Sequence, residues 1–240
     1  MRILSACAAL VALSATAACD RSDPPSNRVK EAMEGAVEAV TTPTPTAAMA
    51  EGRFAPRDEC AAVDGAPAFL AKLRAAVEAR DADALVALTS DQTVLDFGGG
   101  AGGDLLRQRL TDPEYEIWGA LDELAEMGCA PYESAGIVLP WYFAQDLGTD
   151  DPFSTMMVTG ERVPLYKAAS ANSEVLESIS WDVVGLDGGL QPDAQFQKVT
   201  AQSGATGFIA DESLRSQVDY RLIADDVDGR WQITALVAGD

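Results

Sequence analysis

Residues 158–215 contain the pattern that most clearly predicts a fold in this chain. It opens with Val158-Thr159-Gly160-Glu161-Arg162-Val163-Pro164-Leu165-Tyr166. Further short segments that alternate apolar and polar residues follow at 175–179, 181–184, 196–199 and 206–209. Short alternating segments at such close spacing predict five strands, and five short strands predict a small barrel.

The same stretch resembles a bacterial SH3-type domain over nearly the full length that such a domain needs. The resemblance rests on residues 158–166, 181–184 (WDVV) and 206–209 (TGFI). Phe196 stands where the family usually has Trp, and Tyr166 to Ala169 replaces a family turn. The resemblance implies a module that binds cell-wall peptides or partner proteins and is not catalytic in itself.

Two aromatic residues of this module, Tyr166 and Trp181, are the candidate binding residues. An aromatic side chain offers a large contact area at a low cost in conformational entropy. The alternative for each ring is a packing role in the core or in a hairpin. Both alternatives stay open at this point.

Residues 58–157 are expected to form a helix-rich α+β domain. A helix should start after Asp64 or Gly65, with Pro67 in its first turn, and its apolar stripe continues to about Ala79. The other expected elements are a helix at 81–88, a strand at 93–97, a helix at 104–110 capped by Asp104, and a helix from 112 that Gly128 stops.

Within this domain, residues 79–85 (ARDADAL) and 94–99 (VLDFGG) resemble the opening of the cone-shaped α+β superfamily named after nuclear transport factor two. The superfamily has long curved strands at the point that corresponds to the residues after Leu110, whereas this sequence predicts another helix there. The resemblance implies a small-ligand pocket, and some members are enzymes. The alternative function is therefore a His-free enzyme or small-ligand carrier with a pocket in 58–157 near Asp96.

The glycine-rich run at 98–103 does not predict a phosphate loop. It lacks a following Gly-Lys-Ser/Thr, and Asp104 would place a negative charge where the phosphate would lie. We expect a tight turn into a helix instead.

The last residues, 216–240, are expected to form a β-hairpin around Asp228-Gly229, a favoured turn pair. Residues 229–234 (GRWQIT) are similar to the last strands of the cone-shaped superfamily. Because a lone hairpin is marginal in water, this one must pack on another part of the chain. We therefore expect it to complete the sheet of the 58–157 domain. The fold class is α+β.

The first 18 residues are expected to be a signal peptide, since Arg2 precedes an apolar and small-residue run that is too short to span a membrane well. Residues 16–19 resemble a bacterial lipobox, which implies lipidation of Cys19, although ordinary signal peptidase cleavage is the alternative. Asp20 resembles an inner-membrane retention signal. Residues 19–57 are poor in large apolar residues and are expected to be a disordered tether. The expected location is the periplasm, with a lipid anchor in the membrane.

Of the four cysteines, Cys7 lies in the expected signal peptide and Cys19 is the expected lipidation site. The other two, Cys60 and Cys129, are expected to form a disulfide, because an isolated pair in an oxidising compartment is most simply a bridge. Two buried free thiols are the alternative. The pair lacks the CxxC spacing of a redox-active motif.

Charge and composition exclude several functions. The chain carries 17 Lys and Arg against 38 Asp and Glu, a net charge of -21, which becomes -22 when Arg2 leaves with the leader. Nucleic acid is an unsuitable partner for such a chain. The absence of His excludes Ser-His-Asp catalysis and His-ligated zinc. We expect no enzyme, no cofactor and no metal, and instead an exported binding or scaffold protein that contacts peptidoglycan or an envelope protein.

Overall fold

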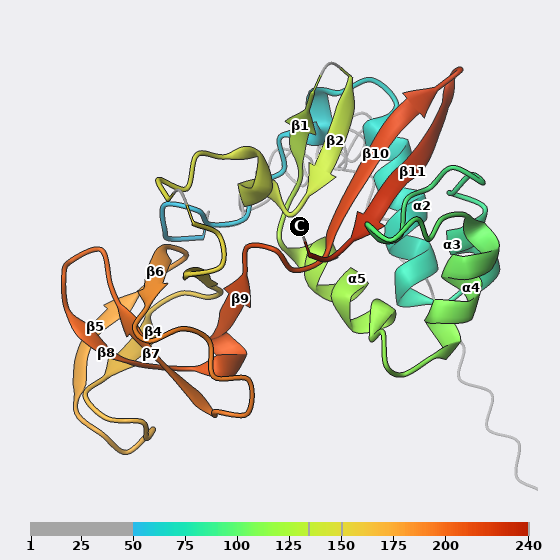
Figure 1. The fold of residues 1–240 in the computed structure, drawn as a ribbon. Helices are drawn as coiled ribbons and strands as arrows, with labels where there is room; N and C mark the ends of the chain where they lie inside the picture. Colours follow the sequence, from blue (N-terminus) through green and yellow to red (C-terminus); the bar gives the residue numbers. More distant parts are fainter. Residues whose placement is uncertain (1–49, 134, 150, 240) are drawn as a thin grey trace, which may run out of the picture. The chain divides into compact units, whose positions relative to one another are not determined.

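The computed structural model describes residues 50–133, 135–149 and 151–239. The expected signal peptide, Cys19, Asp20 and most of the tether lie outside the described residues. Over the described part the protein has a mixed α+β fold with four α-helices, a four-stranded sheet and a seven-stranded sheet (Figure 1). The strands within each sheet pair antiparallel. The α+β class expected from the sequence is confirmed.

Four helices come first along the chain, namely α2 (Ala66–Glu78), α3 (Ala82–Val86), α4 (Gly103–Thr111) and α5 (Ile117–Glu126). Gly65 caps α2 with a φ of 79°, and Pro67 lies in the first turn. Asp81 caps α3 by accepting a hydrogen bond from the Ala84 amide at 3.0 Å. These starts follow from local capping chemistry, so the sequence located them well.

Three local expectations in this region were wrong. Residues 93–97 do not form a strand: only Val94 makes isolated bridges, to Ala101 and Ala235, because the chain turns back after Asp96. Gly102, not Asp104, is the N-cap of α4. Helix α5 begins at Ile117 rather than at 112, after Glu116 in the left-handed conformation with a φ of 47°.

The C-terminal hairpin belongs to the four-stranded sheet. This sheet has the order β1 (Ala130–Tyr132), β2 (Gly136–Leu139), β10 (Arg221–Val227), β11 (Arg230–Val237). Asp228 and Gly229 turn the hairpin with φ values of 55° and 80°. Strand β10 pairs with β2, with Ile223 opposite Val138. Strand β10 of the hairpin thus lies directly beside β2 in the sheet, although β2 ends at Leu139 and β10 begins only at Arg221.

Helices and this sheet share one hydrophobic core. Its largest fully buried side chains are those of Leu85, Leu106, Leu121, Leu124, Ile137, Leu222, Ile233 and Leu236. They come from α3, α4, α5, β2, β10 and β11, so neither the helices nor the hairpin can bury their apolar faces without the other.

The strands of the seven-stranded sheet lie between Thr155 and Ser216, so the sheet includes most of the stretch at 158–215. Its order is β5 (Val175–Ile179), β4 (Val163–Tyr166), β8 (Thr206–Ala210), β7 (Phe196–Thr200), β6 (Val183–Leu186), β3 (Thr155–Val158), β9 (Leu214–Ser216). Its core contains Val158, Leu165, Val184, Val199 and Ile209. Ile209 is fully buried, while its neighbour Phe208 is half-buried.

Gly207 in β8 allows a close approach of the β4 backbone. A Cβ there would lie 2.5 Å from the Tyr166 carbonyl oxygen and 2.9 Å from Leu165 Cγ. Since carbon atoms in contact lie near 3.5–4.0 Å, a larger residue would separate β4 from β8.

A third apolar cluster connects the two sheets. It contains Phe54, Met127, Val138, Trp141, Tyr142, Met157 and Val183. Phe54 is 4% exposed and its amide donates to the Trp181 carbonyl at 2.8 Å. The packed part of the chain therefore includes Phe54, although the tether was expected to extend to residue 57. Phe54 packs there because it provides a large apolar side chain, which the preceding stretch of sequence lacks.

Candidate binding surface

Trp181, two residues before β6, is held in an unusual backbone conformation. Its φ is 40°, a left-handed value that is uncommon for a bulky residue. Two backbone hydrogen bonds hold it there: its amide donates to the Gly160 carbonyl at 3.0 Å, and its carbonyl accepts from the Phe54 amide at 2.8 Å. Backbone strain of this kind persists only where the surrounding structure fixes it.

The half-buried side chain of Trp181 lines a hollow of about 570 Å³, which we call the Trp181 hollow. Met127 and Leu214 add apolar surface to it. Five carboxylates also line it, those of Glu123, Glu126, Asp211, Glu212 and Asp219. The hollow therefore combines an aromatic ring with a strongly acidic lining.

One cation, Arg215 of β9, lies among these carboxylates. Its side chain is 3% exposed, and its Nη1 donates to Glu123 at 2.9 Å and to Asp219 at 3.2 Å. Its Nη2 donates to the Tyr220 carbonyl at 2.5 Å, and its Nε donates to the Tyr142 hydroxyl at 3.0 Å. A buried guanidinium with these partners fixes the positions of two carboxylates whose outer sides face solvent.

Burial also acts on Tyr142, the partner of the Arg215 Nε. Removal of the hydroxyl from water disfavours the phenolate, and this raises the pKa of Tyr142 to about 12, although the Arg215 charge opposes the shift. Tyr142 is therefore neutral at physiological pH.

A second hollow, of about 480 Å³, lies beside Phe196 and is called the Phe196 hollow. Pro192 and Asp193 line it, and so do Asp211 and Glu212, which also line the Trp181 hollow. The ring of Phe196 meets that of Tyr166 edge-on, with the centroids 5.9 Å apart. The two hollows thus share the carboxylates of the short 3-10 turn η3 (Asp211–Ser213).

The two aromatic candidates from the sequence have different positions. Trp181 lines a hollow, whereas Tyr166 is half-buried and packs against Phe196. Sequence reasoning treated Phe196 only as a departure from the family and missed Arg215 and Glu123 entirely. Arg215 follows Leu214 at a strand end, and nothing in the local pattern marks it as buried.

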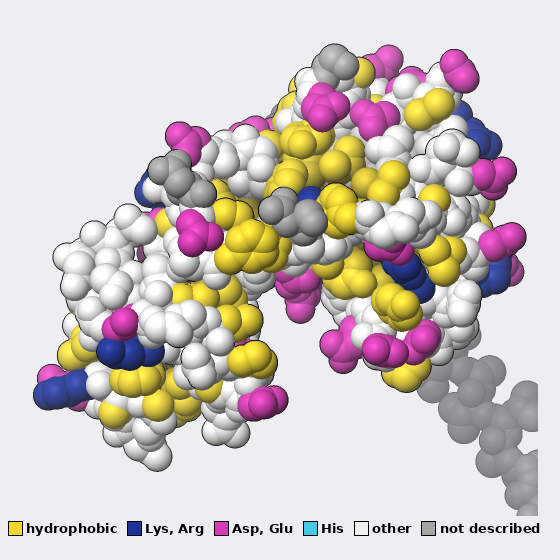
Figure 2. Space-filling view, in the orientation of Figure 1, with side chains coloured by type: hydrophobic (Ala, Val, Ile, Leu, Met, Phe, Trp, Pro, Cys, Tyr) yellow, Lys and Arg dark blue, Asp and Glu magenta, His cyan; other side chains and the backbone are white. Residues whose placement is uncertain are grey.

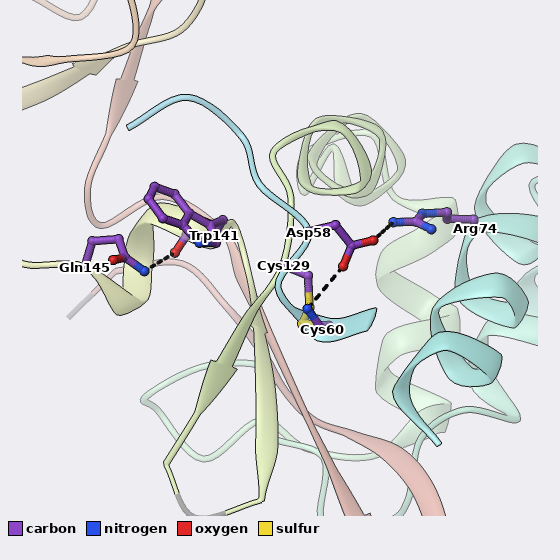
Figure 3. Close-up of a disulfide and its surroundings, with 6 residues drawn as sticks. All are labelled: Asp58, Cys60, Arg74, Cys129, Trp141 and Gln145. Atoms are coloured by element: carbon purple, nitrogen blue, oxygen red, sulfur yellow. Dashed lines mark hydrogen bonds and ion pairs between the residues drawn. A yellow bond between two sulfur atoms is a disulfide. The ribbon is translucent and has the colours of Figure 1, made fainter. Parts of the chain in front are cut away.

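The Cys60–Cys129 disulfide lies at the base of the four-stranded sheet (Figure 3). The two Cα atoms are 5.7 Å apart, and both cysteines are fully buried. The Asp58 carboxylate accepts from the Cys60 amide at 3.2 Å and lies 3.8 Å from the Arg74 guanidinium of α2. The bridge therefore fixes the start of β1 to the segment that enters α2, which indicates a structural role.

Asp96, the focus of the alternative function, is engaged in holding the glycine-rich turn. Its carboxylate accepts from the Gly100 amide at 2.8 Å and forms an ion pair with Arg109. The Gly100 hydrogen bond, followed by the one from Arg109, lowers the pKa of Asp96. A lowered pKa is the opposite of what a general acid needs at neutral pH.

A further hollow, of about 320 Å³, lies near the C-terminus and is lined in part by Phe143, Leu147, Val218 and Arg221. The Arg221 guanidinium lies over the rings of Phe97 and Phe143, at 5.5 and 5.1 Å, and donates to the Gly239 carbonyl at 2.8 Å. Figure 2 shows apolar side chains gathered in front of β2 and β10. Gly239 therefore contacts Arg221 beside this hollow.

The described residues contain no cluster of three or more potential metal ligands. Across the same ranges, no helix is long and apolar enough to cross a membrane. Comparisons of the chain with family models, with curated proteins and with solved structures found no match.

Proposed function

We propose that the protein is an exported binding or scaffold protein of the bacterial envelope, which contacts a cell-wall peptide or a partner protein through the module at 158–215. The observation that carries the proposal is the position of Trp181. Two backbone hydrogen bonds hold this residue at a φ of 40°, and its ring lines a hollow of about 570 Å³.

The neighbouring Phe196 hollow supports the same function. An aromatic ring lines each hollow, and the carboxylates of Asp211 and Glu212 lie between them. Aromatic side chains with a polar rim are typical of binding surfaces that carry most of their energy in a few residues. The lining favours ligands that bear amino or guanidinium groups, because these pair with carboxylates and stack on rings.

The function is tested by recovery of envelope components with the wild-type protein and with Trp181→Ala. We expect wild type to retain peptidoglycan or an envelope protein and Trp181→Ala to retain about tenfold less, as loss of one central aromatic contact costs about 1.4 kcal/mol or more. Glu212→Lys, at an exposed position shared by both hollows, should weaken recovery by reversing one charge.

Phe153→Ala is the matched control, since Phe153 is 61% exposed and lines neither hollow. It should bind as wild type does. Equal recovery by wild type, Trp181→Ala and Glu212→Lys would contradict the proposal.

The sequence also suggested a His-free enzyme or ligand carrier with a pocket near Asp96. Asp96 is paired with Arg109 and its pKa is lowered, so no observation at this residue favours that function.

A further inference from the structure

A third hollow lies at helix α5, outside the module to which the proposed function is assigned. It has a volume of about 640 Å³, and we call it the Tyr115 hollow. Its lining consists of Glu114, Tyr115, Glu116, Gly119, Ala120, Glu123, Asp219 and Tyr220. Two tyrosine rings thus occur together with four carboxylates at the start of α5 and the start of β10.

The three hollows are connected through shared residues. Glu123 and Asp219 line both the Tyr115 hollow and the Trp181 hollow. Asp211 and Glu212 line both the Trp181 hollow and the Phe196 hollow. The hollows therefore form one continuous series from α5, past β9, to the β7–β8 pair.

The charge of this series is strongly one-sided. Its carboxylates are those of Glu114, Glu116, Glu123, Glu126, Asp193, Asp211, Glu212 and Asp219, and Arg215 is the one cation among the described lining residues, so eight negative charges and one positive charge leave a net charge of -7. Arg215 is buried and already paired with Glu123 and Asp219, and therefore does not present a positive surface.

Each hollow is also lined by an aromatic residue, with Tyr115 and Tyr220 in the first, Trp181 in the second and Phe196 in the third. The Arg109 guanidinium already lies over the Tyr115 ring, 4.8 Å from its centroid, which shows that a cation can lie against this ring. A Lys or Arg side chain that enters such a hollow can pair with a carboxylate and also lie on a ring. Several separate hollows in series fit a ligand that offers several cations along its length.

We propose that the series of three hollows binds one extended, basic segment of a partner protein, with the Tyr115 hollow as a part of the site. The proposal rests on the proposed function and narrows its ligand to a positively charged polypeptide. Charge complementarity carries the choice of occupant: a net charge of -7 along the series repels an acidic or anionic ligand and attracts a basic one at long range.

A substitution at Gly119 can block the Tyr115 hollow without damage to the fold. Gly119 is exposed within α5, and a Cβ added there meets no atom within 4 Å. Gly119→Arg introduces both bulk and a positive charge into the Tyr115 hollow. The matched control is Ala71→Arg, because Ala71 is exposed in α2 and lines none of the three hollows. Arg favours a helix more than Gly does and nearly as much as Ala, so neither substitution should damage its helix.

The experiment measures binding of a fluorescent peptide of alternating Lys and Ala to the mature chain by anisotropy. A peptide of about twelve residues reaches about 40 Å when extended. We expect wild type and Ala71→Arg to bind it alike, Gly119→Arg to bind about tenfold more weakly, and all binding to weaken as salt is raised from about 50 to about 300 mM. The matched Glu-Ala peptide should not bind.

Three results would overturn the inference. One is equal binding of the Lys-Ala and Glu-Ala peptides. Another is a loss of Lys-Ala binding in Glu212→Lys with no change in Gly119→Arg, which would confine the site to the module and leave the proposed function intact. Recovery of peptidoglycan without measurable Lys-Ala binding would also overturn it, while supporting the proposed function.

Discussion

The Nε of Arg215 donates to the hydroxyl of Tyr142 at 3.0 Å, and both side chains are buried although 73 residues separate them in the sequence. Arg215 belongs to the seven-stranded sheet, whereas Tyr142 lies in the 3-10 turn η2 (Trp141–Ala144) that follows β2. The same guanidinium reaches Glu123 in α5. One buried cation therefore fastens the seven-stranded sheet to the helical part of the chain.

Replacement of Arg215 should destabilise the protein strongly. Arg215→Met leaves the Tyr142 hydroxyl buried with its donor removed, and we expect a loss of about 3 kcal/mol in the free energy of unfolding, as measured by urea denaturation. Arg107→Met is the control, because the Arg107–Asp83 pair is exposed and should contribute less than about 1 kcal/mol. A similar small effect of both substitutions would show that Arg215 does not fasten the two parts.

Alkaline pH should weaken the fold through Tyr142. Its pKa is about 12 in the folded chain and about 10 in the unfolded chain, so the folded state holds its proton over a pH range in which the unfolded state has lost it. The stabilisation is complete below pH 10 and is lost as the pH rises toward 12, by up to about 3 kcal/mol.

This pH effect can be isolated by comparing urea midpoints of wild type and Tyr142→Phe at about pH 9 and about pH 11. Wild type should lose more stability over this range than the variant. Equal losses would mean that Tyr142 ionises normally in the folded chain.

Removal of the disulfide should cost about 4 kcal/mol in the chain-entropy model, because the bridge joins residues 69 positions apart. The measurement compares thermal unfolding of wild type with that of the double variant Cys60→Ala, Cys129→Ala. Brief treatment with a reductant should leave the native protein oxidised, since both cysteines are 0% exposed. Unchanged unfolding of the double variant would contradict the structural role.

Two glycines should respond in opposite ways to alanine. At Gly128 the φ is 75° and a Cβ would lie 2.2 Å from the Arg57 carbonyl oxygen, so Gly128→Ala should destabilise by more than about 1 kcal/mol. At Gly119 a Cβ is unobstructed, so Gly119→Ala should stabilise α5 by about 0.5–1 kcal/mol. Urea denaturation of both variants tests this pair, and a stabilised Gly128→Ala would show that the turn after α5 is not constrained as described.

Local chemistry explains which elements were predictable. Pro67 and the apolar stripe of α2, the Asp81 cap of α3 and the Asp228-Gly229 turn each act within a few residues, and the structure has each of them. The strand expected at 93–97 does not form because its alternating pattern competes with the hydrogen bond that the Gly100 amide of the glycine-rich turn donates to the Asp96 carboxylate, which the pattern does not reveal.

Composition and short-range spacing are sufficient to establish the α+β class, the absence of His chemistry, the acidic charge and the pair of cysteines available for a bridge. They do not reveal that Glu123, Asp219 and Arg215 meet, or that Tyr115, Trp181 and Phe196 line hollows with shared carboxylates. These residues come from α5 and the turn before it, from β7, β9 and the approach to β6, and from the approach to β10. Their proximity depends on the packing of Met127, Tyr142, Met157 and Val183 between the two sheets, which no local pattern encodes.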